Sequence, residues 1–208
     1  MKVLELFAGT RSIGRAFEER GHEVYSVEWD KKFKNIDLYS DILMVSPRDI
    51  IKDFGNPDVI WASPDCSSYS IAAISHHRSK VDGDLVPISA YAKRCDEVNQ
   101  HMLRLILALS PKYWFIENPR GGMRKMKFME CLPRYTVTYC QYGDTRMKPT
   151  DIWTNHPNPK FKPACHNGDT CHEPAPRGSR SGTQGLKNSM EKAIIPSELC
   201  RHIVNICV

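Results

Sequence analysis

The chain has 208 residues, of which 41% are hydrophobic and 25% are charged. This length suits one domain that buries a core without disulfide or metal cross-links, and the composition excludes a disordered chain. No apolar run reaches the ~20 residues of a membrane helix, and the N-terminus lacks the apolar core of a signal peptide. We therefore expect a cytoplasmic protein with no membrane partner, whose eight cysteines are thiols rather than disulfides.

Charge is distributed unevenly along the chain. The 29 basic and 24 acidic side chains give a net charge of +5. Residues 1–119 carry 15 basic and 17 acidic side chains, a net −2, whereas residues 120–208 carry 14 and 7, a net +7. An asymmetry of this size predicts that the C-terminal part of the chain contacts an anionic partner.

Strand-like and helix-like segments alternate over the first two-thirds of the chain. Short apolar or alternating runs predict strands at residues 3–6, 24–27, 58–62, 113–116 and 135–140. Helical spacing of apolar residues, with flanking Pro or Gly, predicts helices at residues 13–20, 47–54, about 98–109 and 196–207. Repeated βα units predict a doubly wound α/β fold, in which helices cover both faces of a parallel sheet.

The segment after Trp153 has a different character. Five prolines and four glycines lie between residues 155 and 189 and predict a long irregular segment, of the kind that is usually functional. We therefore divide the chain into a domain of residues 1–155, an irregular segment of residues 156–195, and a last helix, residues 196–208, that packs back on the domain.

A glycine turn at residues 7–10 follows the first predicted strand. Glu28 ends the second strand, 19 residues after Gly9. An acid at this distance accepts the hydroxyls of a ribose, and the aromatic ring of Trp29 beside it offers a face to a nucleobase. The pattern predicts a site for a nucleoside cofactor, and the alternative is a tight turn beside a solvated acid.

Further polar groups follow other predicted strands. Cys66 lies in a loop of small polar residues after residues 58–62, and Glu117 directly follows residues 113–116. A basic loop with Arg146 and Lys148 comes after residues 135–140. Ligands bind at the carboxyl ends of the strands in doubly wound sheets, so Cys66 is a candidate nucleophile and Glu117 a candidate acid. The alternatives are a buried structural thiol and a helix-capping carboxylate.

Taken in order, these motifs resemble those of the DNA cytosine-C5 methyltransferase family, and in particular its short, phage-like members with a reduced target-recognition region. The resemblance implies a Rossmann-like methyltransferase sheet that binds S-adenosyl-L-methionine. Residues 6–9 look like the cofactor turn of the family, Glu28 like its ribose-binding acid, and Asp41-Ile42 like its adenine-reading pair. The implied cofactor contacts are Phe7, Ala8, Gly9, Thr10, Glu28, Trp29, Asp41, Ile42 and Pro64.

The resemblance also implies the chemistry. Pro64-Asp65-Cys66 stands where the family has Pro-Pro-Cys, Glu117-Asn118-Pro119 where it has Glu-Asn-Val, and Arg146 with Lys148 where it has Arg-x-Arg. The four implied catalytic residues are Cys66, Glu117, Arg146 and Lys148. They would methylate C5 of a cytosine that is flipped out of double-stranded DNA, through a covalent Cys66–C6 adduct, in the cytoplasm of a bacterial or phage-infected cell.

Three departures from the family pattern keep alternatives open. Asp65 replaces a proline beside the thiol, and a neighbouring carboxylate raises the pKa of a thiol. Lys148 replaces an arginine, and a point charge does not copy bidentate geometry. Only 58 residues follow Thr150, which is short for a recognition domain. The alternatives are C5 methylation of a free cytosine nucleotide and a catalytically weak nucleic-acid-binding relative.

Two segments are expected to contact DNA. The first is the loop after Cys66, which suits closure over a flipped base. The second is a glycine- and serine-rich stretch between residues 177 and 185 that suits approach to phosphates. The alternative for both is a solvated loop. The expected DNA contacts are Ser70, His76, His77, Arg78, Arg177 and Arg180.

Two cysteines and two histidines lie between residues 165 and 172. Thiols and imidazoles are zinc ligands, but the spacing is not a standard one, and four ligands so close in sequence do not readily share one ion. We therefore assign no metal ligand. Zinc at Cys165, Cys171 and His172 stays an open alternative that the sequence does not favour.

Overall fold

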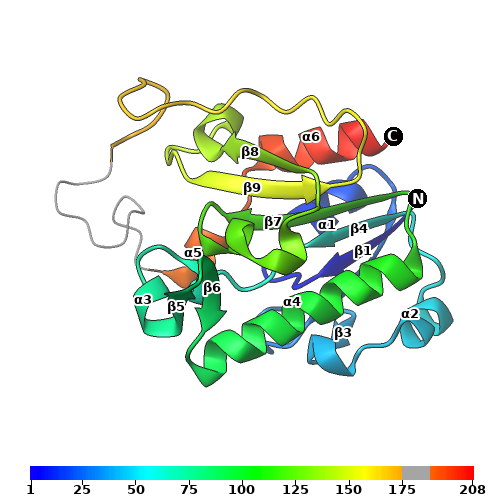
Figure 1. The fold of residues 1–208 in the computed structure, drawn as a ribbon. Helices are drawn as coiled ribbons and strands as arrows, with labels where there is room; N and C mark the ends of the chain where they lie inside the picture. The colour runs from blue at the N-terminus through cyan, green and yellow to red at the C-terminus, as the bar shows by residue number, and fades with distance from the viewer. Residues whose placement is uncertain (175–187) are drawn as a thin grey trace.

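The computed structural model describes residues 1–174 and 188–208, and these residues form one seven-stranded sheet with helices on both faces, and a separate two-stranded hairpin (Figure 1). The sheet order is β3-β2-β1-β4-β7-β9-β8. The strands of the sheet are β1 (Lys2–Leu6), β2 (Glu23–Glu28), β3 (Leu38–Tyr39), β4 (Val59–Ala62), β7 (Tyr113–Pro119), β8 (Arg134–Thr138) and β9 (Pro149–Thr154). The helices are α1 (Ser12–Glu18), α2 (Pro47–Asp53), α3 (Ile74–His77), α4 (Ala90–Leu109), α5 (Ser189–Ala193) and α6 (Ser197–Cys207).

Successive side chains of the central strands point to opposite faces of the sheet and build two cores. On one face Leu4, Ile60 and Ile116 pack with α4 and α2. On the other face Val59 and Phe115 pack with α1 and α6. Because the strands are buried on both sides, they read in the sequence as continuous apolar runs. The predicted doubly wound α/β fold is confirmed.

Helix α4 packs on one face of the sheet and lies below β1, β4 and β7 in the view of Figure 1. The Ser89 hydroxyl accepts a hydrogen bond from the Ala92 amide and caps its first turn, and Ser110 ends it with a left-handed φ of 46° just before Pro111. One stripe of α4 is buried and the opposite stripe is exposed. None of the helices in the described parts of the chain combines the length and the apolar composition needed to cross a bilayer.

The sheet departs from the predicted all-parallel arrangement at β9. This strand runs antiparallel to both β7 and β8, whereas the sequence predicted only a basic loop before residue 150. The sequence of β9 lacks the alternation of apolar and polar residues that indicates a half-exposed strand, because five of its six residues are buried in the strand between β7 and β8. Strand β8 ends at Thr138, earlier than predicted, since a 3₁₀ turn (Tyr139–Tyr142) follows it.

The loop after Cys66 also contains regular structure that the sequence analysis missed. Helix α3 is followed by a hairpin of β5 (Arg78–Val81) and β6 (Asp84–Pro87). Its turn is Asp82-Gly83, with φ angles of 50° and 94°. Asp-Gly between two short runs is the strongest local hairpin signal, so the turn was readable from the sequence.

Arg78 was expected to reach DNA, and its position contradicts this. The side chain is fully buried, and its guanidinium donates hydrogen bonds of 2.7 and 3.0 Å to the two carboxylate oxygens of Asp96 on α4. It also stacks 4.2 Å from the centroid of the Tyr69 ring, and the Tyr69 hydroxyl donates to Asp96. Arg78 therefore anchors the Cys66 loop to α4 and is not available to a phosphate.

This ion pair makes a testable contribution to stability. Asp96→Ala leaves the Arg78 charge buried without its partner, and we expect the free energy of unfolding to fall by about 3–5 kcal/mol. Urea denaturation followed by circular dichroism measures the change. The control Lys127→Ala breaks the exposed pair of Lys127 with Asp84 and should leave the denaturation midpoint unchanged. Equal midpoints for the two variants would contradict the anchoring role.

Candidate active site

The carboxyl ends of the parallel strands converge at one edge of the sheet. Leu6 of β1 is in register with Val27 of β2 and with Ala62 of β4, and Ala62 is in register with Ile116 of β7. The chain leaves β1 toward β2 and β3 and returns to β4 on the other side of β1. The loops after β1 and β4 therefore flank a topological switch point, where sheets of this class bind ligands.

Glu28 organises the loop after β1. Its carboxylate is buried and accepts hydrogen bonds from the backbone amides of Gly9 (3.0 Å), Trp29 (2.9 Å) and Asp30 (3.0 Å). Gly9 has a φ of +49°, which a glycine adopts without strain, whereas Phe7 holds a φ of 55° at a cost. Oε1 of Glu28 accepts two of these hydrogen bonds and Oε2 only one, so Oε2 keeps a lone pair for an additional donor such as a ribose hydroxyl.

The other expected cofactor residues are distributed around this turn. Trp29 is 71% exposed at the end of β2, while Ala8, Ile42 and Pro64 are buried. The Thr10 hydroxyl lies 2.9 Å from that of Ser12. Asp41 accepts from the Leu43 amide and forms an ion pair with Arg94 of α4, so part of its hydrogen-bonding capacity is already used.

The sequence analysis passed over Glu5, a buried acid inside β1. Burial raises the pKa of Glu5 to about 7, although the Gly14 amide donates to its carboxylate. A Cβ at Gly14 would lie 2.4 Å from the Glu5 Oε2 atom, so glycine is required where α1 passes the strand. An acid within an apolar strand was the available signal, and Glu5 holds the first turn of α1 against β1.

Cys66 lies after β4 as predicted, in a partly buried position. Burial, together with the negative charges of Asp65 and Glu117, raises the pKa of the Cys66 thiol to about 11, and the positive charge of Lys148 opposes this rise. The Asp65 carboxylate accepts hydrogen bonds from the Ser67 amide (2.7 Å) and from the Tyr91 hydroxyl. Asp65 therefore fixes the turn after the thiol rather than pairing with Arg146.

Glu117 and Asn118 end β7 beside the Cys66 loop. Asn118 is fully buried and donates from Nδ2 to the Pro64 carbonyl at 2.9 Å, which ties the end of β7 to the loop after β4. The Tyr139 hydroxyl donates to Glu117 Oε1 at 3.1 Å. Burial and the Glu117 carboxylate raise the pKa of Tyr139, so this phenol remains a donor. Tyr139 and Asn118 were not identified as site residues from the sequence.

The basic loop reaches the same place because β9 runs antiparallel to β7. Burial lowers the pKa of Lys148, and the charges of Glu117 and Cys66 counteract this. Its ammonium lies 4.5 Å from the centroid of the Tyr139 ring and donates to the Lys192 carbonyl at 2.8 Å. Arg146 is held by Asp144, whose carboxylate accepts from its Nε atom at 2.9 Å. Within the described residues, the buried Nη1 atom of Arg146 has no hydrogen-bond partner.

The remaining residues that were expected to contact DNA differ in exposure and in their contacts. His76 is exposed at the end of α3, and Ser70 is partly exposed before it. His77 Nδ1 lies 2.9 Å from the Ser89 hydroxyl, and its ring packs on Tyr91. Arg177 and Arg180 lie outside the described residues.

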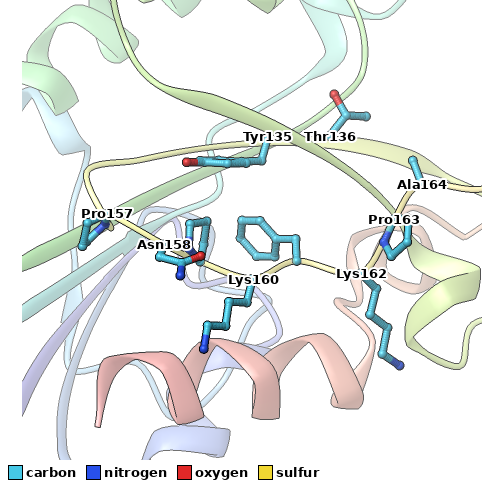
Figure 2. Close-up of a pocket in the computed structure, with 10 residues that line it drawn as sticks. Tyr135, Thr136, Pro157, Asn158, Lys160, Lys162, Pro163 and Ala164 are labelled. Carbon is cyan, nitrogen blue, oxygen red and sulfur yellow. The ribbon is translucent and has the colours of Figure 1, made fainter.

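A shallow hollow elsewhere on the surface does not belong to this site. Figure 2 shows it between Tyr135 of β8 and the extended segment of residues 157–164, with Lys160 and Lys162 beside it. No residue that the sequence assigned to the cofactor, the chemistry or DNA lines it.

The Cys66 environment makes a testable prediction about thiol reactivity. Asp65→Asn keeps an oxygen for the Ser67 amide but removes a negative charge, so the pKa of Cys66 should fall and its thiolate fraction at pH 8 should rise roughly three- to tenfold. Iodoacetamide labelling of the Cys66 peptide against pH, read by mass spectrometry, measures this. Asp82→Asn, in the β5–β6 turn, is the control. An unshifted labelling profile would show that the Asp65 charge does not act on the thiol.

Solved structures share the fold of this chain. A DNMT2 mutant of Spodoptera frugiperda matches with a TM-score of 0.50 and 16% identity, covering 74% of this chain and 49% of its own. S. pombe Dnmt2 matches at 0.51 and 13% identity, covering 74% and 48%, and Entamoeba histolytica EhMeth at 0.52 and 15%, covering 74% and 52%. The chain spans about half the length of these proteins.

Sequence comparison identifies the family. A model described as C-5 cytosine-specific DNA methylase matches residues 1–138, which include the cofactor turn, Cys66 and Glu117 but not Arg146 or Lys148. A curated relative from Frog virus 3 (isolate Goorha), described as "Probable DNA (cytosine-5)-methyltransferase", is 31% identical over 160 residues, which cover 74% of this chain and 71% of the relative. With the resemblance of the motifs confirmed in this way, the chain belongs to the C-5 cytosine-specific DNA methylase family.

Proposed function

We propose that the protein transfers a methyl group from S-adenosylmethionine to C5 of a cytosine in DNA, through a covalent bond between Cys66 Sγ and C6. The observation that carries the proposal is the convergence of Cys66, Glu117 and Lys148 from separate segments. Asn118, next to Glu117, donates to the Pro64 carbonyl in the loop of Cys66. Tyr139, whose ring lies against Lys148, donates to Glu117. The three converging residues lie beside the turn that Glu28 organises, at the switch point of the sheet.

The thiolate of Cys66 starts the reaction by adding to C6 of the cytosine ring. The Sγ–C6 bond forms, and the electron pair of the C5=C6 bond makes C5 nucleophilic. S-adenosylmethionine would supply the methyl group: the bond from C5 to the methyl carbon forms as the methyl–sulfur bond breaks, and the sulfur keeps that electron pair in S-adenosylhomocysteine. A base then takes the proton from C5, the C5=C6 double bond re-forms, and Cys66 leaves as a thiolate.

Glu117 and the cations assist the addition. Glu117 would hydrogen-bond or protonate N3 of the cytosine ring. The Tyr139 hydroxyl donates to Glu117 Oε1, which would leave Oε2 for the cytosine. The unpartnered Nη1 atom of Arg146 is a buried donor suited to the O2 atom, where negative charge develops. Lys148 favours the thiolate form of Cys66.

The residues around the Glu28 turn fit the methyl donor. The remaining lone pair of Glu28 Oε2 suits a ribose hydroxyl, the exposed ring of Trp29 suits stacking on adenine, and the Gly9 turn lets a ligand approach the backbone. We propose that Phe7, Ala8, Thr10, Asp41, Ile42 and Pro64 complete this site.

A charge-removing variant tests the cofactor site without any nucleic acid. Glu28→Gln keeps one acceptor oxygen for the loop amides but replaces the other by an NH2 donor and removes the negative charge, and we expect the Kd for S-adenosylhomocysteine to rise roughly 10–100-fold. Isothermal titration calorimetry measures it. Glu23→Gln, an exposed acid of the same strand, should bind like the unaltered protein. Equal affinities for both variants would place the cofactor elsewhere.

Double-stranded DNA with a flipped cytosine is the proposed partner. Ser70, His76 and His77 lie on the Cys66 loop, which the Arg78–Asp96 pair anchors, and would border the flipped base. We propose residues 1–155 as the catalytic domain and residues 156–195, with Arg177 and Arg180, as a reduced DNA-contact segment. The charge of +7 over residues 120–208 supports an anionic partner there. Residues 196–208 contain α6, which packs back on the sheet of the proposed catalytic domain.

A catalytically weak nucleic-acid-binding relative is the second candidate. The observation that favours it is the raised pKa of Cys66, which keeps the thiol protonated at neutral pH in the free protein. Under the first proposal, positive charge near the thiol, from Lys148 and from the sulfonium of a bound methyl donor, lowers the pKa of Cys66 during the reaction.

Methyl transfer separates these candidates. With tritium-labelled S-adenosylmethionine we expect label in unmethylated duplex DNA, none with Cys66→Ala, and a rate roughly 10²–10³-fold lower with Glu117→Gln. Cys131→Ser, at an exposed cysteine away from the site, is the matched control and should retain full activity. A covalent adduct with 5-fluorocytosine DNA would appear only when Cys66 is present.

Each contrary result has a distinct meaning. Label found only in dCMP would replace the DNA substrate by a free nucleotide, and label only in RNA would replace it by RNA. DNA binding without label or adduct would favour the weak relative. Undiminished transfer by Cys66→Ala would exclude the thiol mechanism altogether.

A further inference from the structure

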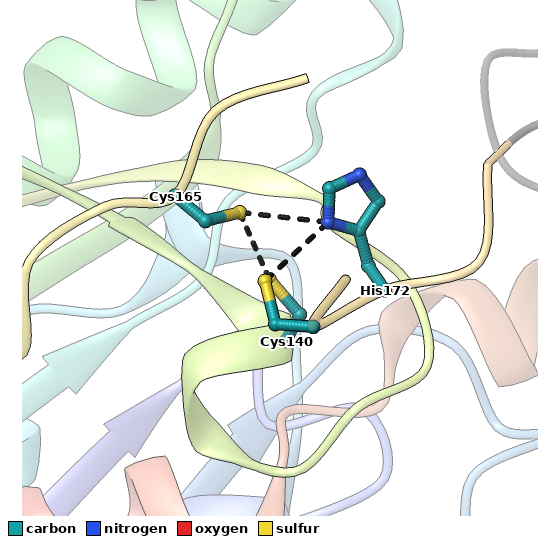
Figure 3. A group of neighbouring side chains, drawn as sticks. Cys140, Cys165 and His172 are labelled. Atoms are coloured by element: carbon teal, nitrogen blue, oxygen red, sulfur yellow. Dashed lines mark hydrogen bonds between the residues drawn. The ribbon is translucent and has the colours of Figure 1, made fainter. Parts of the chain in front are cut away.

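Three thiols and one imidazole meet at the end of β8, on elements far apart in the sequence. Cys140 lies in the 3₁₀ turn after β8, and Cys165, Cys171 and His172 lie on the segment that returns along the sheet edge. One ligand atom from each of these residues lies within 4.8 Å of all the others. Figure 3 shows Cys140, Cys165 and His172 pointing toward one another.

The distances match the edges of a coordination tetrahedron. With Zn–S bonds of about 2.3 Å and Zn–N bonds of about 2.0 Å, a tetrahedral ion sets sulfur atoms about 3.8 Å apart and sulfur and nitrogen about 3.5 Å apart. The Sγ atoms of Cys140 and Cys171 are 3.6 Å apart. The Nδ1 atom of His172 is 3.7 Å from the sulfur of Cys165 and 3.5 Å from that of Cys171. The 3.1 Å between Cys140 and Cys165 needs only a small expansion.

We propose that these side chains form a structural Zn²⁺ site with four ligands: Cys140, Cys165, Cys171 and His172. The donor set is soft and Cys₃His, which is characteristic of structural zinc. Binding releases three thiol protons to solvent, His172 ligates through the lone pair of Nδ1, and the site carries a net charge of −1. Four protein ligands leave no open position, so the ion has no role as a Lewis acid.

The polar groups around the cluster support the ligands. The Gln141 side-chain amide donates to Cys171 Sγ at 3.4 Å, and the Cys165 amide donates to the Thr138 hydroxyl at 3.0 Å. The Gln141 donor would stabilise the negative charge of a Cys171 thiolate, and the Thr138 bond fixes the backbone that carries Cys165. His166 is not a member: it is exposed, and its amide donates to Asp169 in a local turn.

Three of the four ligands lie close together in the sequence, whereas the fourth comes from an earlier segment. Cys165, Cys171 and His172 alone offer an incomplete set, and adding His166 would crowd one ion. Cys140 supplies the missing thiolate from 25 residues earlier in the chain, a separation that matches no familiar zinc motif. Only the folding of the chain back along β8 brings it near.

The site would fasten the irregular segment to the loop that carries the basic site residues. The 3₁₀ turn with Cys140 leads directly into residues 143–148, and the Glu173 amide, next to His172, donates to the Thr145 carbonyl at 2.9 Å. A metal at this point therefore cross-links residues 165–173 to the loop that holds Arg146 and Lys148.

Metal analysis tests the proposal independently of methyl transfer. The full-length protein, purified without chelator, should contain about one zinc per chain by mass spectrometry. Cys140→Ser and His172→Gln should each lose most of it. Cys131→Ser and His166→Gln are matched controls in exposed positions and should retain it, as should Cys66→Ser. Removing zinc with a chelator should lower Tm by roughly 5–10 °C.

Cobalt substitution keeps the proposal testable if the ligand variants fail to fold. Co²⁺ added to the unaltered, metal-stripped protein should give the intense visible bands of a tetrahedral site and thiolate-to-cobalt absorption in the near ultraviolet. Three outcomes would overturn the site: no bound zinc and no tetrahedral spectrum, a Cys140–Cys165 disulfide in the peptide map, or equal metal loss in the His166→Gln control.

Discussion

The antiparallel pairing of β9 with β7 is the constraint on which the site depends. It places the start of β9 beside the end of β7, with Asn118 in register with Asp151. The loop before β9 therefore arrives at the carboxyl ends of the parallel strands, where Glu117 lies. Asp151 secures this register, because its fully buried carboxylate accepts from Arg124 Nε at 2.8 Å and from the Thr136 hydroxyl at 2.8 Å. A slip of one residue would turn that carboxylate to the opposite face of the sheet.

The same pairing sets the charge balance of the site. Lys148 is brought between two acidic groups, the thiol of Cys66 and the carboxylate of Glu117, in surroundings that burial makes poor in water. Burial lowers the pKa of Lys148 and raises that of Cys66, and the attraction between the two groups opposes both shifts. A charged ligand bound beside this pair would therefore act on the pKa of both groups.

The sequence was informative where the structure is local. Strands β1, β2, β4 and β7 are mostly apolar, and the polar residues of the site follow these segments closely in the sequence, so the cofactor turn, Cys66 and Glu117 could be placed from spacing. Strand β9 was missed because a strand buried between two neighbours shows no alternation. The prediction that Arg78 contacts DNA was wrong because its buried partner, Asp96, lies 18 residues away and no pattern near Arg78 in the sequence indicates the pair. Cys140 was missed for the same reason: its neighbours in space come from a later segment.

The 3₁₀ turn after β8 joins the proposed chemistry to the proposed metal site. Tyr139, which orients Glu117 and lies under Lys148, and Cys140, which would ligate zinc, are adjacent residues of that turn. A metal ion that fixed Cys140 would therefore also fix Tyr139, whose hydroxyl positions Glu117. The groups after β1 and β4 have their own supports, Glu28 for the cofactor turn and the Arg78–Asp96 pair for the Cys66 loop. The two halves of the site are thus stabilised separately, and the metal cluster would control only the half that supplies the acid and the cations.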